Sequence, residues 1–187
     1  HVVWNNSAGE LWRRTKQAIE RQLGQLARRR GIPFVEVPGS DGKIRLVSPV
    51  RVAHGKAAEY QARGAVHFHA LLRLDGYEHD PEHPGRIVSP PPGITVADLD
   101  DAVRHAARVI GFRTEPHPAR PGGWIIGWGT ELDVRVISMT GTSTITDLAV
   151  ASYLAKYSTK GTEATGHVSA RITPDTIGLY ADPDGTH

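Results

Sequence analysis

Residues 65–75, with the sequence AVHFHALLRLD, form the clearest strand pattern in the chain. Every second position from Val66 to Leu74 is apolar, whereas His67 and His69 occupy positions in between. Successive side chains of a strand point to opposite faces of a sheet, so the two imidazoles share one face while Phe68 points to the core. The stretch therefore predicts a half-buried strand that carries two histidines on one face.

The residues before this strand predict its hairpin partner. Residues 43–61 have spaced apolar side chains and are expected to be extended, and residues 62–64 suit a hairpin loop. Such a loop places His67 opposite Glu59. Directly opposed side chains share a face of a sheet, so Glu59 is expected beside both histidines. A shift of the register by one residue would remove this neighbour.

Two imidazoles and a carboxylate are a ligand set for a divalent cation. Glu59, His67 and His69 leave coordination positions open for water and a phosphate, which suits Mg²⁺ or Mn²⁺ acting on a phosphodiester. The alternative is a surface salt bridge between Glu59 and a histidine. Glu131 and Asp133 are reserve candidates for the third ligand.

A second histidine group occurs in the Pro-rich segment 76–93, which reads as a surface loop. It contains His79, Glu82 and His83. Side chains in such loops are usually solvated, so no metal role is assigned to them.

The remaining segments predict an α+β domain, with an antiparallel sheet and helices mainly on one face. Ser7 and Glu10 form a capping-box pattern for a helix over 7–30 that ends at Gly31. Thr95 and Asp98 form another for a helix to about Ile110. We also expect a short strand at 32–37, a loop at 114–123, an extended stretch at 124–137, and a helix at 145–160.

The helix expected at 145–160 carries two tyrosines and two lysines on one side. At about 100° per residue, Tyr153, Lys156, Tyr157 and Lys160 fall within an arc of about 100°. A phenol can attack a phosphodiester, and a nearby ammonium can lower the phenol pKa or steady the phosphate. The alternative is an amphipathic helix whose tyrosines pack on a neighbouring element.

Composition limits the classes of protein that the chain can belong to. The 187 residues suit one domain, and a hydrophobic content of 39% is ordinary for a globular protein. There is no cysteine, so a metal must be held by His, Asp or Glu. No apolar run approaches the roughly 20 residues that span a bilayer, and a cytoplasmic setting fits. The net charge of +2 is a mild indication of a polyanion partner.

These motifs together resemble a known family. HFHALLRLD resembles the His-hydrophobe-His motif of HUH endonucleases, and YLAKYSTK resembles the two-tyrosine motif of rolling-circle initiators. VVWNNSAGELWRRT, RGAVHFHALLRLDG, WGTELDVRVI and YLAKYSTKGTEATG are similar to replication initiators of actinobacterial plasmids and integrative elements. The similar stretches span positions 2–166.

The resemblance implies an antiparallel sheet of about five strands flanked by helices. It implies nicking of one origin strand through a covalent 5′-phosphotyrosine, with Tyr153 or Tyr157 as nucleophile and His67 and His69 as metal ligands. Glu59 would match the acidic residue one strand upstream in related initiators. The partner is single-stranded origin DNA, with backbone contacts expected from Arg63 and Arg73. A host polymerase and helicase are possible further partners.

The chain departs from the family pattern at its start. An early Thr-rich strand motif and a Cys-rich segment are missing, so we expect the domain to lack a strand or to use one from outside the fragment. We expect residues 1–187 to be a single nickase domain, a fragment of a longer initiator, with a less certain tail at 161–187. Three alternatives stay open at this point. A relaxase or transposase would share the chemistry, a DNA-binding module would bind without cutting, and a metallohydrolase would cut without a covalent adduct.

Overall fold

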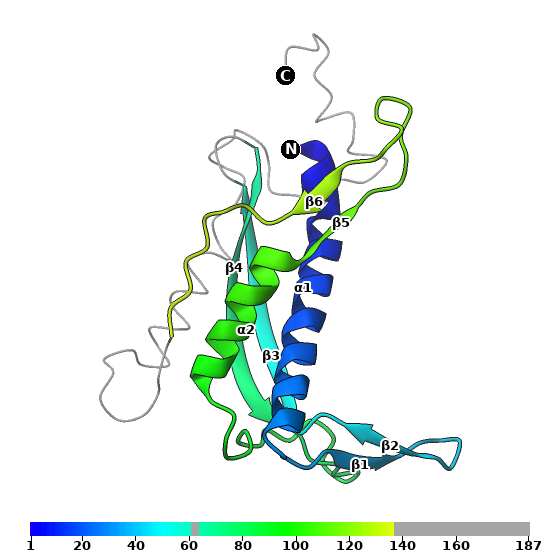
Figure 1. Ribbon diagram of the computed structural model, residues 1–187, viewed down its shortest axis with the longest axis vertical. Helices are drawn as coiled ribbons and strands as arrows, with labels where there is room; N and C mark the ends of the chain where they lie inside the picture. The colour runs from blue at the N-terminus through cyan, green and yellow to red at the C-terminus, as the bar shows by residue number, and fades with distance from the viewer. Residues whose placement is uncertain (61–63, 137–187) are drawn as a thin grey trace.

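Two helices cover one face of a long β-hairpin in the computed structural model, which describes residues 1–60 and 64–136. Helix α1 (Val2–Arg29) and helix α2 (Val96–Val109) lie side by side over strands β3 (Val50–Tyr60) and β4 (Val66–Gly76), as Figure 1 shows. Strands β1 (Val35–Pro38) and β2 (Ile44–Val47) form a second hairpin, which projects near the end of α1. Strands β5 (Gly111–Arg113) and β6 (Ile125–Gly127) pair near its beginning.

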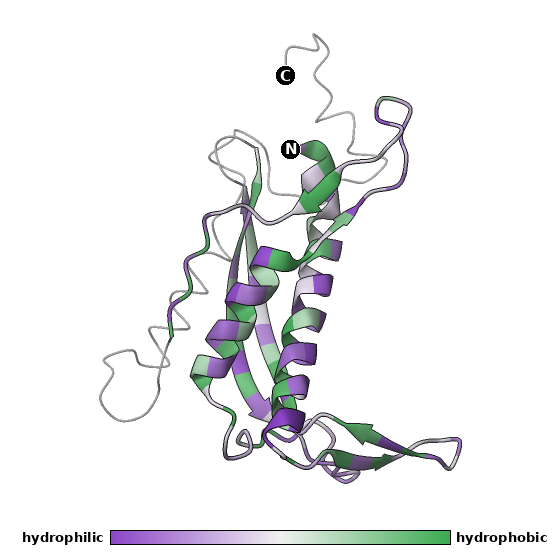
Figure 2. Ribbon diagram, viewed as in Figure 1, coloured by the Kyte–Doolittle hydropathy of each residue, from purple (hydrophilic) through white to green (hydrophobic). Residues whose placement is uncertain are grey.

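The hydrophobic core lies between the helices and the β3–β4 hairpin. Along α1 the buried side chains recur every three or four residues, which places them on one face of the helix. Figure 2 shows the resulting alternation of hydrophobic and hydrophilic residues along both helices. The core residues come from α1, β3, β4, the segment just before α2, and α2 itself: Ile19, Leu23, Ala27, Val50, Val52, Leu74, Ile94, Leu99, Ala102 and Ala106.

Helix α1 begins earlier than the sequence predicted. Its N-cap is His1, so Ser7 lies inside the helix and the predicted Ser7–Glu10 capping box is wrong. Glu10 instead accepts hydrogen bonds from Arg13 and Arg14, which hold the pKa of its carboxyl at about 2. A tertiary contact stabilises the additional first turn of α1. The Trp4 indole N–H in this turn donates a hydrogen bond to the carbonyl of Gly127 on β6.

The end of α1 agrees with the prediction. Gly31 has a φ of 68°, a left-handed conformation that costs glycine little. The N–H groups of Gly31 and Ile32 donate to the carbonyls of Arg28 and Ala27, which closes the last turn. Glycine is therefore the residue that terminates the helix here.

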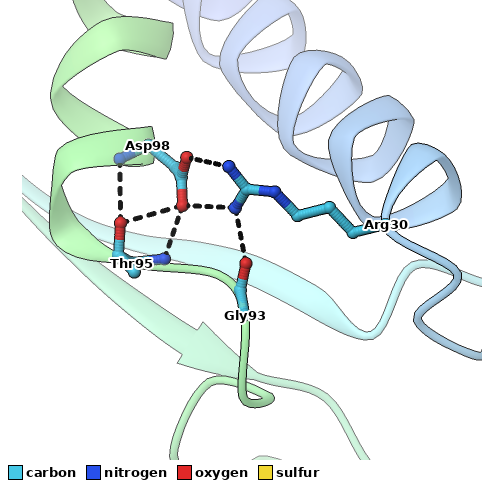
Figure 3. Close-up of polar contacts among 4 residues, drawn as sticks. All are labelled: Arg30, Gly93, Thr95 and Asp98. Carbon is cyan, nitrogen blue, oxygen red and sulfur yellow. Dashed lines mark hydrogen bonds and ion pairs between the residues drawn. The ribbon is translucent and has the colours of Figure 1, made fainter.

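Arg30, just after α1, joins the two helices. Its guanidinium contacts both carboxylate oxygens of Asp98 at 2.7 and 2.8 Å and also the carbonyl of Gly93 (Figure 3). Asp98 is at the same time the N3 residue of the Thr95 capping box, which the sequence predicted and the structure confirms. One carboxylate thus caps α2 and binds the residue that follows α1.

The α+β class and the antiparallel pairing are confirmed, but a continuous sheet of about five strands is not. Over residues 1–60 and 64–136 the strands form three separate pairs, β1–β2, β3–β4 and β5–β6. Of the extended stretch predicted at 124–137, only β6 is observed as a strand, and residues 128–136 are irregular. Val134 there accepts a hydrogen bond from the Arg104 side chain of α2, so its carbonyl contacts a helix and not a neighbouring strand.

Both loops that the sequence predicted, at 76–93 and 114–123, lack long elements of secondary structure. The helix expected at 145–160 and the tail at 161–187 lie outside the described residues. Neither α1 nor α2, the two helices in the described ranges, has an apolar stretch long enough to cross a membrane.

Candidate functional site

The β3–β4 register places three candidate ligands together. Glu59 pairs with His67, and Ala57 pairs with His69, as the predicted hairpin loop requires. Since paired residues share a face and residues two apart on a strand do also, Glu59, His67 and His69 all lie on the same face of the hairpin. The register prediction is therefore confirmed.

The side chains of this group are in mutual contact. His69 Nε2 lies 3.3 Å from Glu59 Oε2, and the two imidazole rings have their centroids 4.7 Å apart at an angle of 53°. The side chains of His69 and Glu59 are 15% and 26% exposed, whereas His67 is exposed. The group thus has one half-buried carboxylate–imidazole pair and one exposed imidazole.

The donor types fit a divalent cation, but the arrangement is not that of a bound ion. Within residues 1–60 and 64–136, no three His, Asp or Glu side chains are positioned to hold a metal. Glu59 and His69 contact each other directly, so a cation bound by all three residues would replace that contact. Carboxylate and imidazole ligands bind a metal in their deprotonated forms, so binding of a cation by these residues would release any proton that they hold.

The opposite face of the hairpin holds the site in place through aromatic contacts. Phe68, between the two histidines in sequence, packs edge-on against Trp128 with ring centroids 5.7 Å apart, and 6.2 Å from Trp12. The Lys56 ammonium lies 4.1 Å from the Phe68 centroid, and partial burial lowers the pKa of Lys56. Phe68 thus lies on the face opposite the histidines, as predicted, but it is half-buried and lies outside the core cluster.

Asn5 binds the start of β4, a contact that sequence reasoning missed. Its side-chain amide donates to the carbonyl of Gly64 at 2.8 Å and accepts from the N–H of Val66 at 3.0 Å. Asn5 is 59 and 61 residues away from these partners, and a single sequence carries no signal for such a contact. The two hydrogen bonds lie on either side of Ala65, and the second is to the residue directly before His67.

Arg73, predicted to contact DNA, shares the face of His67 and His69 but has a protein partner. Its guanidinium binds both carboxylate oxygens of Asp75 at 2.7 and 3.0 Å, and its side chain remains 57% exposed. The DNA role of Arg73 stays a prediction. Arg63, the other predicted DNA contact, lies outside the described residues.

Within residues 1–60 and 64–136, no further carboxylate or imidazole joins Glu59, His67 and His69 in a cluster that could hold a metal. Glu131 and Asp133, the reserve ligands, are exposed, and Asp133 pairs with Arg135 at 3.0 Å. In the loop at 76–93, His83 contacts Asp80 at 3.2 Å. The residues of the tyrosine motif, Tyr153, Lys156, Tyr157 and Lys160, lie outside the described residues.

A large groove runs beside the candidate site. It has a volume of about 1000 Å³, and its walls include His67 and Arg73 of β4, Val103 of α2, and the aromatic residues Trp12 and Trp128. The groove thus borders His67 of the candidate site.

The fold and the site define an α+β domain with a carboxylate and two imidazoles on one face of an antiparallel hairpin. Residues 1–187 match the family described as replication initiator protein, pSAM2. A replication initiator protein of Streptomyces ambofaciens is 44% identical over 177 residues, covering 91% of this chain and 34% of that relative. The chain therefore spans about a third of the relative's length. No solved structure matches.

The chain belongs to the family of pSAM2-type replication initiator proteins. The resemblance drawn from the motifs is thus confirmed at the level of replication initiators. The narrower assignment to HUH endonucleases stays a prediction.

Proposed function

We propose that the chain is the metal-dependent nickase domain of a replication initiator, which cuts one strand of its origin through a covalent phosphotyrosine. The observation that carries the proposal is the β3–β4 register, which groups Glu59 with His67 and His69 on one face. Membership in the initiator family supports origin DNA as the substrate. Among the alternatives, a relaxase or transposase would use the same groups on a different DNA.

Glu59, His67 and His69 would hold the cation, Mg²⁺ or Mn²⁺. Bound there, the cation would withdraw electron density from the scissile phosphate. The groove beside His67 supports single-stranded DNA as the ligand next to the cation. Its walls include aromatic side chains, and single-stranded DNA binds by stacking of its bases and by charge. Arg63 and Arg73 would contact the phosphate backbone.

The phenol oxygen of Tyr153 or Tyr157 would attack the phosphorus. The bond from phosphorus to the 3′ oxygen breaks, the phenol proton is lost, and the 3′ oxygen leaves as a hydroxyl for a polymerase to extend. The 5′ phosphate stays on the tyrosine, so a later 3′-hydroxyl can reverse the step and rejoin the strand. Lys156 and Lys160 would neutralise charge on the five-coordinate phosphate.

The test is a covalent-adduct assay. The chain is mixed with single-stranded DNA that carries the cognate origin, with Mn²⁺, and resolved on a denaturing gel beside Tyr153→Phe, Tyr157→Phe and the double variant. A shifted band that needs metal and disappears in one single variant names the nucleophile. Loss only in the double variant shows that the tyrosines can replace each other.

The same gel separates the alternatives of another class. His69→Ala should lower the adduct yield by at least about tenfold, because it removes one proposed ligand and changes even to groups that only support a ligand cost about 10- to 100-fold. Binding of origin DNA without an adduct, with metal present, would contradict the covalent mechanism. It would leave a DNA-binding module if the DNA stays intact, or a hydrolase if the DNA is cut and released.

A further inference from the structure

Asn5 holds the backbone beside the candidate metal centre from a different element. Its amide makes two hydrogen bonds to the turn and start of β4, one to the carbonyl of Gly64 and one from the N–H of Val66. The N–H of Val66 thus donates to a side chain of α1, which takes the place that a backbone carbonyl of a neighbouring strand would have. The bond fixes the backbone directly before His67.

The element that presents Asn5 is itself anchored. The adjacent Trp4 donates its indole N–H to the Gly127 carbonyl at 2.9 Å, and its ring lies 6.1 Å from that of Trp128. Trp128 in turn packs against Phe68 and donates to Thr15 Oγ1 at 2.8 Å. The first turn of α1 and the strand that carries both histidines are therefore held to the same ring.

Register is the property that this contact protects. If β4 slipped by one residue against β3, His67 and His69 would turn toward α1 and leave Glu59 on the other face. Gly64 has a φ of 75°, a left-handed conformation that glycine adopts readily. The hydrogen bond from the Asn5 amide to the Gly64 carbonyl stabilises this conformation.

We infer that Asn5 is a positioning residue for the metal centre, acting through the backbone of Gly64 and Val66. The inference rests on the proposed function, since it assumes that Glu59, His67 and His69 bind a cation. Groups that orient metal ligands without touching the metal commonly change affinity by 10- to 100-fold. A change at Asn5 should therefore lower the affinity for the metal, and it should have a smaller effect on the rate of adduct formation once the metal is bound.

The experiment measures Mn²⁺ binding to the full 187-residue chain by loss of the free-ion electron paramagnetic resonance signal. Asn5→Ala is expected to raise the Kd by about tenfold at a temperature well below its Tm. Asn6→Ala, at the next and exposed position of α1, is the matched control and should stay within about twofold of the wild type. Saturating Mn²⁺ should restore the adduct rate of Asn5→Ala.

The metal centre and the role of Asn5 are tested separately by these measurements. Wild-type Mn²⁺ binding that is absent, or unchanged by His69→Ala, would contradict the metal centre itself. Binding that depends on His69 but is equal in Asn5→Ala and Asn6→Ala would overturn the role of Asn5 alone. If Asn5→Ala does not fold, Asn5→Gln keeps the amide but displaces it by one methylene. A Kd raised at least about threefold then supports the inference, and an unchanged Kd overturns it.

Discussion

At the scale of single residues, Arg73 has a partner in the fold that is independent of its proposed contact with DNA. Asp75 is only 3% exposed, and Arg73 covers it with two charge-assisted hydrogen bonds. Replacing Arg73 by Met leaves a buried carboxylate without its partner. We expect the free energy of unfolding to fall by about 1–2 kcal/mol, a moderate value because the guanidinium is half exposed.

A double-mutant cycle measured by urea unfolding checks this expectation. In an Asp75→Asn background the same Arg73→Met change should cost less, since no charge remains to be neutralised. Equal costs in both backgrounds would show that Arg73 and Asp75 are not coupled. A loss of DNA affinity in Arg73→Met with no loss of stability would instead assign the guanidinium to the ligand alone.

The residues of the candidate site were predictable to the extent that their geometry is local. Glu59, His67 and His69 follow from the period of a strand and the length of one hairpin loop, and both are properties of adjacent residues. Asn5 could not be found in this way, because its partners are chosen by how α1 packs on β4. The Arg73–Asp75 pair lies on one strand, but its importance depends on the burial of Asp75, which only the fold reveals.

At the scale of elements, the Arg30–Asp98 contact gives the α1–α2 packing a pH dependence. The Arg30 guanidinium, with hydrogen bonds from Thr95, holds the pKa of Asp98 at about 2, below its ordinary value of 3.8. A lowered pKa means that the stabilisation is fully present above about pH 4 and disappears as the pH falls through 2. Asp98→Asn should therefore lower the Tm at pH 7 by about 2–4 °C.

The measurement is the Tm of wild type and variant across pH 2–7. The difference between them should be constant from pH 7 to 5 and should shrink between about pH 4 and pH 2. Asp101→Asn, an exposed position on the same helix, serves as the control and should show no such difference. A difference between wild type and Asp98→Asn that stays constant down to pH 2 would mean that the carboxylate charge is not what joins the helices.

Elements were predicted best where their ends are marked by local chemistry. Thr95 with Asp98 marks the start of α2, and Gly31 marks the end of α1, and both are confirmed. Ser7 was wrong as a start because Trp4, by contacting β6, makes the preceding turn favourable. Residues 131–136 alternate between apolar and charged side chains but do not form a strand. An alternating pattern forms a strand only where a neighbouring strand is available for pairing.

At the scale of the whole molecule, Trp128 connects elements that are distant in sequence. It contacts Trp4 and Thr15 of α1 and Phe68 of β4, and it directly follows β6. Trp128→Ala removes all of these contacts, and we expect it to lower the free energy of unfolding by about 2–4 kcal/mol. Trp128→Phe keeps a ring but loses the bond to Thr15 and should cost about 1 kcal/mol.

Hydrogen exchange tests whether this ring makes the domain unfold as one unit. In Trp128→Ala, amides in the first half of α1 and at the start of β4 should lose protection together, because both were held to the removed side chain. Trp124→Ala is the matched control, since that ring packs on His117 of the loop at 114–123 and should affect that loop alone. Loss of protection in α1 without any in β4 would show that the two are anchored separately. The candidate metal centre would then depend on β3 and Asn5, and not on the aromatic contacts behind it.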